Sequence, residues 1–128
     1  MSSPSGPAAL PPGSKAKLTV VKGKRAGKTY GVKEGGVTYI GGAGKFPVDV
    51  NLDEQDRPGV LANRHALVYY EKGMLSIADT KTPNGTFVNK VRLQPGKRYA
   101  LKGDDLIQVG NVTLQVKVII KKRTGVQK

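Results

Sequence analysis

Residues 79–89 read DTKTPNGTFVN, and this stretch shows the pattern that decides the fold. Asn84 and Gly85 tolerate positive backbone φ angles, so the pair favours a tight turn. The apolar run TFV follows the turn directly, as a β-strand does. The stretch therefore predicts a turn that leads straight into a strand.

The same pattern, a short apolar or alternating run closed by Gly, Pro, Asn or Asp, repeats from Lys17 onward. The runs are LTVV, TYGV, VTYI, VDVNL, HALVYY, MLSIA, TFVN, YAL, LIQVG and VTLQVKVII. In the last run, Val112, Leu114, Val116 and Val118 alternate with polar residues, as in a half-buried strand. Turn signals recur about every ten residues and no stretch has a helical period, so we predict an antiparallel β-sandwich or barrel with little or no helix.

The chain of 128 residues has the length of one domain. Its 17 Gly, 8 Pro and 38% hydrophobic residues are typical of a turn-rich globular protein. The first residues are mostly Ser, Pro, Ala and Gly, which bury too little apolar surface to offset the entropy of ordering. We therefore predict a flexible arm at 1–16, one folded domain at 17–120 and a basic C-terminal tail at 121–128.

Several classes of site are disfavoured by the residues that are missing. There is no cysteine and a single histidine, His65, so we expect no disulfide, no metal site and no cofactor. The segment GGAGKF at 41–46 resembles a phosphate-binding loop, but Tyr39 replaces its first glycine and Phe46 replaces its hydroxyl residue. No set of catalytic residues remains, and we expect a non-enzymatic protein.

The sequence contains no run of 18 apolar residues and no recognisable secretory signal. We therefore expect a soluble, intracellular protein without a membrane span. A targeting peptide that has already been removed stays an open alternative, and the organelle is not indicated.

The charge is strongly unbalanced, with 22 Lys and Arg against 9 Asp and Glu and a net charge of +13. The basic residues cluster in a loop and at the C-terminal end, namely Lys22, Lys24, Arg25 and Lys28, and then Lys117, Lys121, Lys122, Arg123 and Lys128. Such clusters attract acidic protein surfaces or nucleic acid. No strand shows aromatic residues alternating with Lys or Arg, so we expect no stacking platform for bases.

Five blocks occur in an order that resembles the forkhead-associated (FHA) family. They are TYIGG at 38–42, VDVNL at 48–52, ANRHA at 62–66, DTKTPNGTFVN at 79–89 and LKGDDLIQVG at 101–110. The resemblance covers about residues 17–120. It implies an eleven-stranded antiparallel β-sandwich whose loops at one end bind phosphothreonine peptides, and hence a non-catalytic protein–protein interaction module.

The resemblance also implies which residues form the binding site. The implied peptide- or phosphopeptide-binding residues are Gly42, Asn63, Arg64, Thr82, Pro83 and Asn84, and those that brace the loops are His65, Gly85 and Asn89. Lys45 and Lys81, together with Arg64, are candidate compensating cations.

Compensation is needed because a phosphate, with about −1.5 to −2 charge, requires an arginine, hydroxyls and N–H donors. Gly42 stands where the family has an arginine and Ala62 where it has a serine. The position before Asn84 lies close to the phosphate in the family, and here it is Pro83, which has neither a hydroxyl nor an N–H.

Three functional hypotheses remain open. The first is an FHA-type module that binds a partner protein through the loops at one end with weakened dependence on phosphate. The second is a functional phosphothreonine reader whose cations have been relocated. The third is a basic accessory subunit of a larger assembly or nucleic-acid complex.

Overall fold

The computed structural model describes residues 10, 13–42, 44–55 and 63–120. The basic tail and most of the arm predicted from the sequence lie outside these residues. The described part contains eleven strands and one short 3-10 turn. The strands are β1 (Lys15–Lys22), β2 (Thr29–Gly31), β3 (Gly36–Gly41), β4 (Val50–Asn51), β5 (Ala66–Glu71), β6 (Met74–Asp79), β7 (Thr86–Val88), β8 (Val91–Arg92), β9 (Tyr99–Ala100), β10 (Leu106–Val109) and β11 (Val112–Ile119), and the 3-10 turn η1 is Asp53–Gln55.

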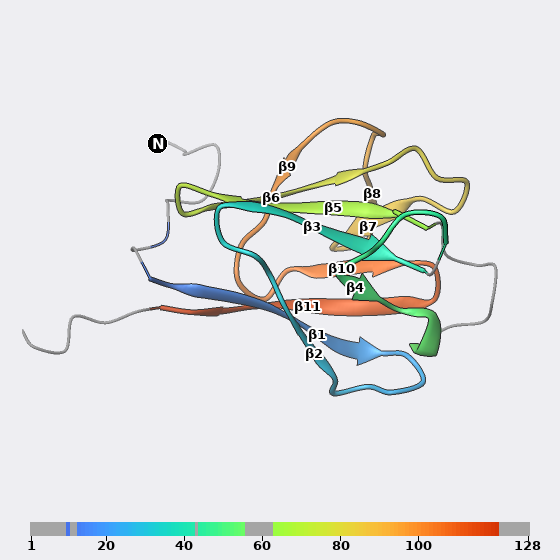
Figure 1. The fold of residues 1–128 in the computed structure, drawn as a ribbon, viewed down its shortest axis with the longest axis horizontal. Helices are drawn as coiled ribbons and strands as arrows, with labels where there is room; N and C mark the ends of the chain where they lie inside the picture. Colours follow the sequence, from blue (N-terminus) through green and yellow to red (C-terminus); the bar gives the residue numbers. More distant parts are fainter. Residues whose placement is uncertain (1–9, 11–12, 43, 56–62, 121–128) are drawn as a thin grey trace, which may run out of the picture.

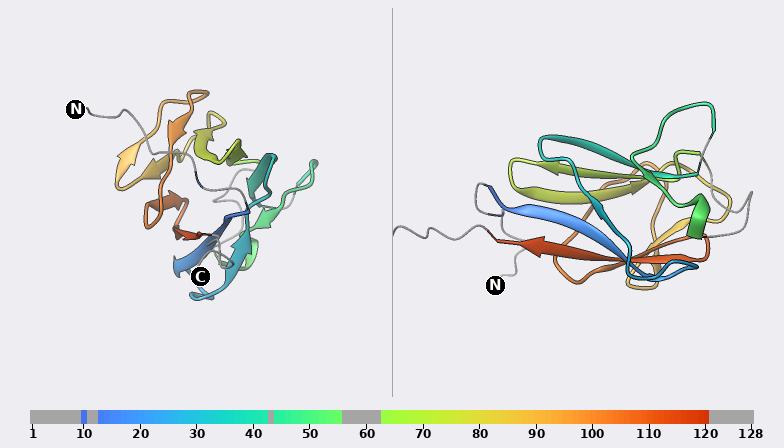
Figure 2. Two further views of the ribbon diagram at one scale, coloured as in Figure 1. Left: turned by 90° about the vertical axis from the view of Figure 1, so that its left-hand side faces the viewer. Right: turned by 60° about the horizontal axis from the view of Figure 1, so that its bottom comes forward.

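The strands form two sheets that pack face to face as a β-sandwich (Figures 1 and 2). The six-stranded sheet has the order β2-β1-β11-β10-β7-β8, and the five-stranded sheet has the order β4-β3-β5-β6-β9. The predicted eleven-stranded sandwich with almost no helix is confirmed. Within the described residues, no helix is long and apolar enough to cross a membrane.

One pair of strands departs from the expected antiparallel arrangement. β3 and β4 are parallel, with Ile40 opposite Val50. The chain leaves β3 at Gly41 and returns beside it at Asp49, whose N–H donates to the carbonyl of Tyr39 (3.0 Å). Because this return brings the chain back to the middle of β3, β4 then runs in the same direction as its neighbour.

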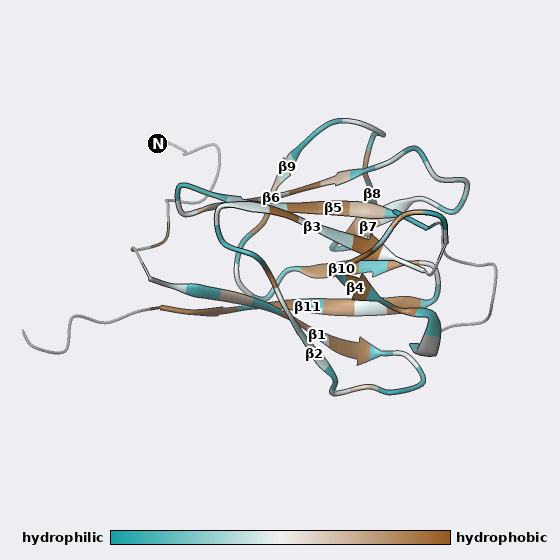
Figure 3. Ribbon diagram, viewed as in Figure 1, coloured by the Kyte–Doolittle hydropathy of each residue, from teal (hydrophilic) through white to brown (hydrophobic). Residues whose placement is uncertain are grey.

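The core lies between the two sheets and is built by alternation along the strands. In β11, Val112, Leu114 and Val116 are fully buried and Val118 packs partly against the core, as the sequence pattern predicted. β1 pairs with β11 from Lys15 opposite Ile119 onward, and this pairing is the longest among the described strands. Figure 3 shows the resulting contrast between apolar strands and hydrophilic loops.

The folded domain begins slightly earlier than the sequence analysis placed it. β1 starts at Lys15, and both Ser14 and Ala16 are buried. The hydroxyl of Tyr70 donates to the carbonyl of Ser14 (2.7 Å), which ties the chain to β5 before β1 begins. Part of the segment assigned to the arm therefore belongs to the sandwich.

The strand directions bring several loops to one end of the sandwich, at the right of Figure 1. These are the β1–β2 loop, the chain on either side of β4, and the β6–β7 loop. The start of β1 and the end of β11 lie at the opposite end. The first group of loops is called the loop end below.

Candidate functional site

Asp79, the last residue of β6, organises the β6–β7 loop. Its Oδ2 accepts hydrogen bonds from the backbone N–H groups of Lys81 (2.9 Å) and Thr82 (3.2 Å). Its Oδ1 accepts from the hydroxyls of Thr82 (3.0 Å) and Thr86 (2.7 Å). These four bonds fix the loop near its start, at Lys81 and Thr82, and at Thr86, where β7 begins.

The same bonds keep Asp79 ionised although it is buried. Burial alone would raise its pKa, but the hydrogen bonds from Thr86, Thr82 and the Lys81 backbone outweigh burial and lower the pKa below its ordinary value of 3.8. A carboxylate that accepts several hydrogen bonds is stabilised in its charged form. Asp79 therefore stays negative at neutral pH.

Thr82 is placed inside the loop and directs its hydroxyl inward. The side chain is only 8% exposed. Its Oγ1 donates to Asp79, accepts from the N–H of Gly85 (3.0 Å) and lies 3.2 Å from Nε2 of His65. A hydroxyl has one hydrogen and two lone pairs, so these contacts leave little capacity for a ligand.

His65 is fully buried and links the binding loops to the sheet. Its Nε2 lies 2.8 Å from the carbonyl of Gly85, and because a carbonyl can only accept, Nε2 carries the hydrogen. Its backbone N–H donates to Ile40 (2.7 Å), and its backbone carbonyl accepts from the N–H and the hydroxyl of Thr80. The contacts of His65 therefore join β3, β5 and the β6–β7 loop.

Asn63 connects the segment before β5 to the β3–β4 loop. Its Nδ2 donates to the carbonyls of Gly42 (2.8 Å) and Phe46 (2.9 Å), and its Oδ1 accepts from the N–H of Phe46 (2.8 Å). Both amide hydrogens are therefore used within the protein. Gly44 lies directly beneath this amide, because a Cβ built there would come within 2.6 Å of Asn63 Cγ.

Arg64 lies against the same loop. Its guanidinium stacks on Tyr39 (3.9 Å from Cζ to the ring centroid) and lies 5.2 Å from the ring centroid of Phe46. Its Nε donates to the carbonyl of Pro47 (3.0 Å). This candidate cation is therefore held over Tyr39 of β3 and beside Phe46 of the β3–β4 loop, which is 53% exposed.

Pro83, Asn84 and Gly85 form the turn at the tip of the β6–β7 loop. Pro83 and Asn84 are exposed, whereas Gly85 is buried with a φ of +76°. Arg92 of β8 lies beside the turn and donates from Nη2 to the carbonyl of Pro83 (3.3 Å). The positive φ favours glycine at position 85, and a Cβ there would come within 2.7 Å of Arg92 Nε and displace that side chain.

The other implied ligands and cations differ in their placement. Gly42 is buried at the end of β3 and offers no side chain. Lys45 and Lys81 are both exposed, Lys45 on the β3–β4 loop and Lys81 on the β6–β7 loop. Ala62 lies outside the described residues.

Asn89 contacts a different loop from the other bracing residues. Its Nδ2 donates to Oδ1 of Asp105 (3.0 Å) and its Oδ1 accepts from the N–H of Leu106 (3.0 Å). The pKa of Asp105 is affected most by burial, which raises it, but hydrogen bonds from Asn89 and Lys102 lower it overall. Asn89 thus fastens the β7–β8 turn to the start of β10.

The basic β1–β2 loop also lies at the loop end and has a fixed backbone. Gln55 of η1, which is 2% exposed, accepts from the N–H of Arg25 (2.6 Å) through Oε1 and donates to its carbonyl (3.1 Å). The carbonyl of Gln55 also accepts from the N–H of Lys24 (3.2 Å). The other basic cluster begins at Lys117 on β11, near the opposite end.

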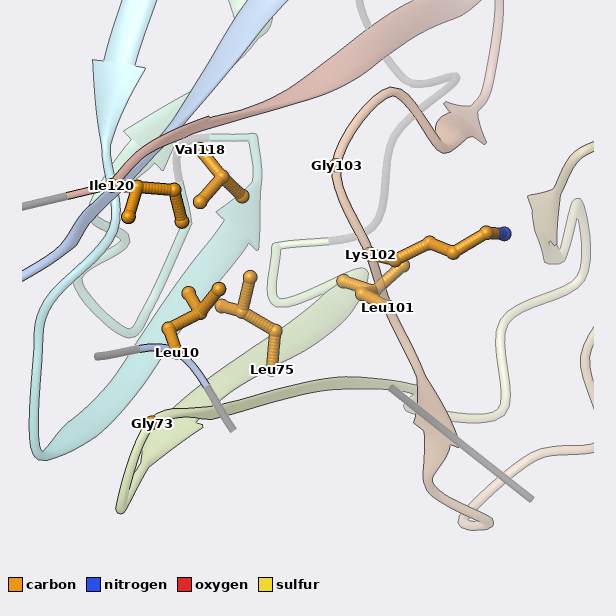
Figure 4. A pocket seen from close by; sticks show the side chains of 8 residues that line it. All are labelled: Leu10, Gly73, Leu75, Leu101, Lys102, Gly103, Val118 and Ile120. Carbon is orange, nitrogen blue, oxygen red and sulfur yellow. The ribbon is translucent and has the colours of Figure 1, made fainter. Parts of the chain in front are cut away.

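An apolar pocket of about 260 Å³ lies at that opposite end, away from all of these loops (Figure 4). Leu10, Leu75, Val118 and Ile120 face one another across it. The ammonium of Lys102 on its wall pairs with Asp105 at 2.9 Å. The pocket is therefore an open end of the hydrophobic core rather than part of the candidate binding site.

Comparison with known proteins agrees with this fold. The model of the FHA domain family matches residues 38–110. The glycogen accumulation regulator GarA of Mycobacterium tuberculosis is 32% identical over 111 residues, which cover 86% of this chain and 61% of GarA. The chain spans less than two thirds of the length of the curated relatives it matches.

Two solved structures show the same architecture. The FHA domain of an Arabidopsis thaliana hypothetical protein superposes with a TM-score of 0.73 and 22% identity, over 94% of this chain and 97% of that one. A structure determined for phosphothreonine-dependent FHA domain interactions superposes with a TM-score of 0.66 and 24% identity, over 80% of this chain and 95% of that one. This chain belongs to the FHA domain family, whose domains are protein-interaction modules.

Sequence reasoning missed two residues at the loop end, Arg92 and Gln55. For Arg92 the available sequence signal was Asn89, a residue type that tolerates positive φ; in the structure Asn89 and Lys90 both have positive φ and form a two-residue hairpin turn. Counting back from that turn pairs Arg92 with Phe87, next to the Asn84–Gly85 turn. No signal marked Gln55, because its role depends on η1 folding against a loop 30 residues away.

Proposed function

We propose that this chain binds a partner protein through the loop end, with a weakened dependence on phosphothreonine. The contact surface consists of the β3–β4 loop, the segment at Asn63 and Arg64, and the β6–β7 loop. The partner is a protein segment, and phosphorylation of a threonine in it contributes less than in a site that has a full set of phosphate ligands.

The observation that carries this proposal is that the polar groups of the candidate site are already used within the protein. The hydroxyl of Thr82 has three internal contacts, and the amide of Asn63 bonds to the β3–β4 loop. Gly42 has no side chain and Pro83 has no N–H. Each missing charge-assisted hydrogen bond costs about 1.5–3 kcal/mol, so the absence of two lowers phosphopeptide affinity on the order of 100-fold or more.

A second candidate, a phosphothreonine reader with relocated cations, is favoured by the position of Arg92. Its guanidinium lies at the carbonyl of Pro83, beside the exposed tip of the β6–β7 loop. Lys81 and Lys45 are exposed on the two flanking loops. Together these three residues offer positive charge to a phosphate held at Asn84.

A third candidate, binding to acidic surfaces or nucleic acid, is favoured by the basic β1–β2 loop. Its backbone is fixed by Gln55, so Lys22, Lys24, Arg25 and Lys28 are presented together at the loop end. A fixed cluster of charge attracts an acidic partner without a new ordering cost. This candidate is compatible with the first, because both use the same end of the molecule.

Binding to a library of threonine peptides, each with and without phosphate, tests the proposal. We expect the paired peptides to differ by less than about tenfold in affinity, which corresponds to about 1.4 kcal/mol. A preference of several hundredfold for the phosphorylated peptides would reject binding with weakened phosphate dependence in favour of the second candidate, a phosphothreonine reader with relocated cations. If Arg92→Gln then removed that preference while Lys117→Gln did not, the relocated cation would be identified.

Restoring the missing ligands provides a gain-of-function test. We predict that Gly42→Arg combined with Ala62→Ser raises the affinity for phosphorylated peptides and leaves that for unphosphorylated peptides unchanged. The two changes add an arginine and a hydroxyl to the set of phosphate ligands. Isothermal titration with paired peptides measures the gain, and its absence would contradict the assignment of these two positions to the phosphate end.

A further inference from the structure

The outer face of the five-stranded sheet carries an apolar surface that the sequence did not reveal. Val37, Tyr39, Leu67 and Tyr69 are half-buried, but they point away from the core cluster. The register makes them neighbours, because Val37 lies opposite Tyr69 and Tyr39 lies opposite Leu67. Ala78 of β6 extends this row, since it lies opposite Leu67. These five residues are called the outer face below.

Two arginines cover the tyrosines of the outer face. Arg98 lies with Cζ 3.5 Å from the ring centroid of Tyr69, and Arg64 lies 3.9 Å from that of Tyr39. Stacking of this kind holds a guanidinium in place while its edge stays available for hydrogen bonds. Arg64 and Arg98 lie in the loops before β5 and β9 rather than alternating with the tyrosines along a strand, so the residue pattern of the strands did not reveal this stacking.

A hollow of about 280 Å³ opens on this face between the sheet and two loops. It is lined by residues of β5 and β6, of the β6–β7 loop and of the β8–β9 loop, namely Leu67, Tyr69, Ala78, Asp79, Thr80, Lys81, Pro95 and Gly96. This volume is slightly smaller than that of typical small-molecule pockets, and it suits one apolar side chain of a partner. Lys81 is only one residue from Thr82, so the hollow continues directly from the candidate binding loops.

The charge around the hollow favours an acidic partner. Among the described residues, Asp79 is the acid that lines it, and both of its oxygens are used within the β6–β7 loop. Glu71 pairs with Arg98 at 3.2 Å on the exposed surface, where such a pair contributes little. Lys81 lines the hollow and Arg98 stacks on Tyr69, so both add positive charge on the same side.

We propose that the outer face and its hollow are a second contact surface, which binds an acidic stretch containing one apolar side chain in the partner segment held at the loop end. The apolar side chain enters the hollow over Leu67, and the acidic side chains contact Arg98 and Lys81. This inference rests on the proposed function, because it takes the peptide at Asn84 as its starting point.

A protein segment fits this surface better than a nucleic acid does. Single-stranded nucleic acid requires open aromatic ring faces for its bases. Here the outward faces of Tyr39 and Tyr69 are each covered by a guanidinium. A hollow with a leucine and an alanine in its lining offers apolar contact to a side chain rather than a stacking surface to a base.

The test uses the full chain and a degenerate peptide library with a central threonine, in phosphorylated and unphosphorylated form. The informative variants are Leu67→Glu and Arg98→Gln. Their matched controls are Val91→Glu, an exposed apolar residue on the other sheet, and Lys117→Gln, a surface cation on β11. Thermal unfolding of each variant shows that the fold is intact.

We expect wild-type protein to select acidic residues and one apolar residue on one side of the central threonine. Leu67→Glu and Arg98→Gln should each reduce the selection of these flanking residues about fivefold or more, while both control variants retain it. In all variants the ratio of binding to phosphorylated and unphosphorylated central threonine should be unchanged. If the wild type selects no residues beside the central threonine, or if all variants select them equally, the inference is overturned while the proposed function stays intact.

Two further outcomes would also overturn the inference. Failure of the wild type to bind any peptide would reject the proposed function as well. Binding to single-stranded oligothymidine that is lost in Leu67→Glu and retained in Val91→Glu would assign the outer face to nucleic acid.

Discussion

At the scale of single residues, Asp79 controls the geometry of the candidate site. It accepts four hydrogen bonds from three residues, and the loop that carries Pro83 and Asn84 closes around it. The resemblance of residues 79–89 to a family motif identified where the loop is. It did not reveal that the hydroxyl of Thr82 is consumed by Asp79 and Gly85, because this depends on how the loop closes in space.

We predict that Asp79→Asn destabilises the protein by about 2–4 kcal/mol. An amide has one acceptor oxygen, so two of the four donors lose their partner while they are buried. Urea unfolding measures the change. Asp104→Asn is the matched control, because Asp104 is exposed and its positive φ of 72° suits asparagine; a similar loss in both variants would contradict the role assigned to Asp79.

The lowered pKa values of Asp79, Asp105 and Asp49 predict an acid-sensitive fold. For Asp49, as for the other two, burial raises the pKa, but hydrogen bonds, here from Lys33 and Tyr39, lower it overall. Since each folded-state pKa lies below the ordinary 3.8, the stabilisation is complete above that pH and is lost as the pH falls through the folded-state values. Unfolding free energies measured from pH 6 down to pH 2 should show this loss, and Asp79→Asn should reduce it.

At the scale of elements, the β3–β4 loop is held by side chains rather than by strand pairing. Asn63 makes three hydrogen bonds to it, and Gly44 provides the space for that amide. The strands themselves were predictable from alternation and turn residues. The parallel β3–β4 pair was not, because it depends on the path of the chain between Gly41 and Asp49.

We predict that Gly44→Ala displaces Asn63 and loosens the β3–β4 loop. The new Cβ would come within 2.6 Å of Asn63 Cγ, so the amide must move and lose its bonds to Gly42 and Phe46, at a cost of about 1–3 kcal/mol. Amide hydrogen exchange at Phe46 should accelerate. Gly31→Ala, where an added Cβ meets nothing within 4 Å, should leave that exchange unchanged, and equal effects would contradict the steric argument.

At the scale of the whole molecule, basic residues of the described part of the chain lie at both ends of the sandwich. Lys22 is the last residue of β1 and Lys24 follows it, so both lie at the loop end. Lys15 and Lys17 lie at the start of β1, toward the opposite end. The net charge of +13 was evident from the sequence, but its division between two ends required the pairing of β1 with β11. Only charge at the loop end can act together with the candidate binding loops.

We predict that Lys22→Gln with Lys24→Gln weakens binding of acidic peptides about two- to fivefold and flattens its salt dependence. Lys15→Gln with Lys17→Gln removes the same charge and should have little effect, because it acts at the far end. Fluorescence anisotropy over a range of salt concentrations measures the affinity of each double variant for acidic peptides. Equal losses would mean that net charge, rather than its position, drives binding.

The pairing of Lys15 with Ile119 has a consequence for how this fold can be used. The start of β1 and the end of β11 lie side by side at the end of the sandwich opposite the candidate binding loops. A sandwich with this geometry can be inserted into a surface loop of a host protein without spreading the ends of that loop. It would then project its recognition loops outward, so the same arrangement suits circular permutation and tandem display.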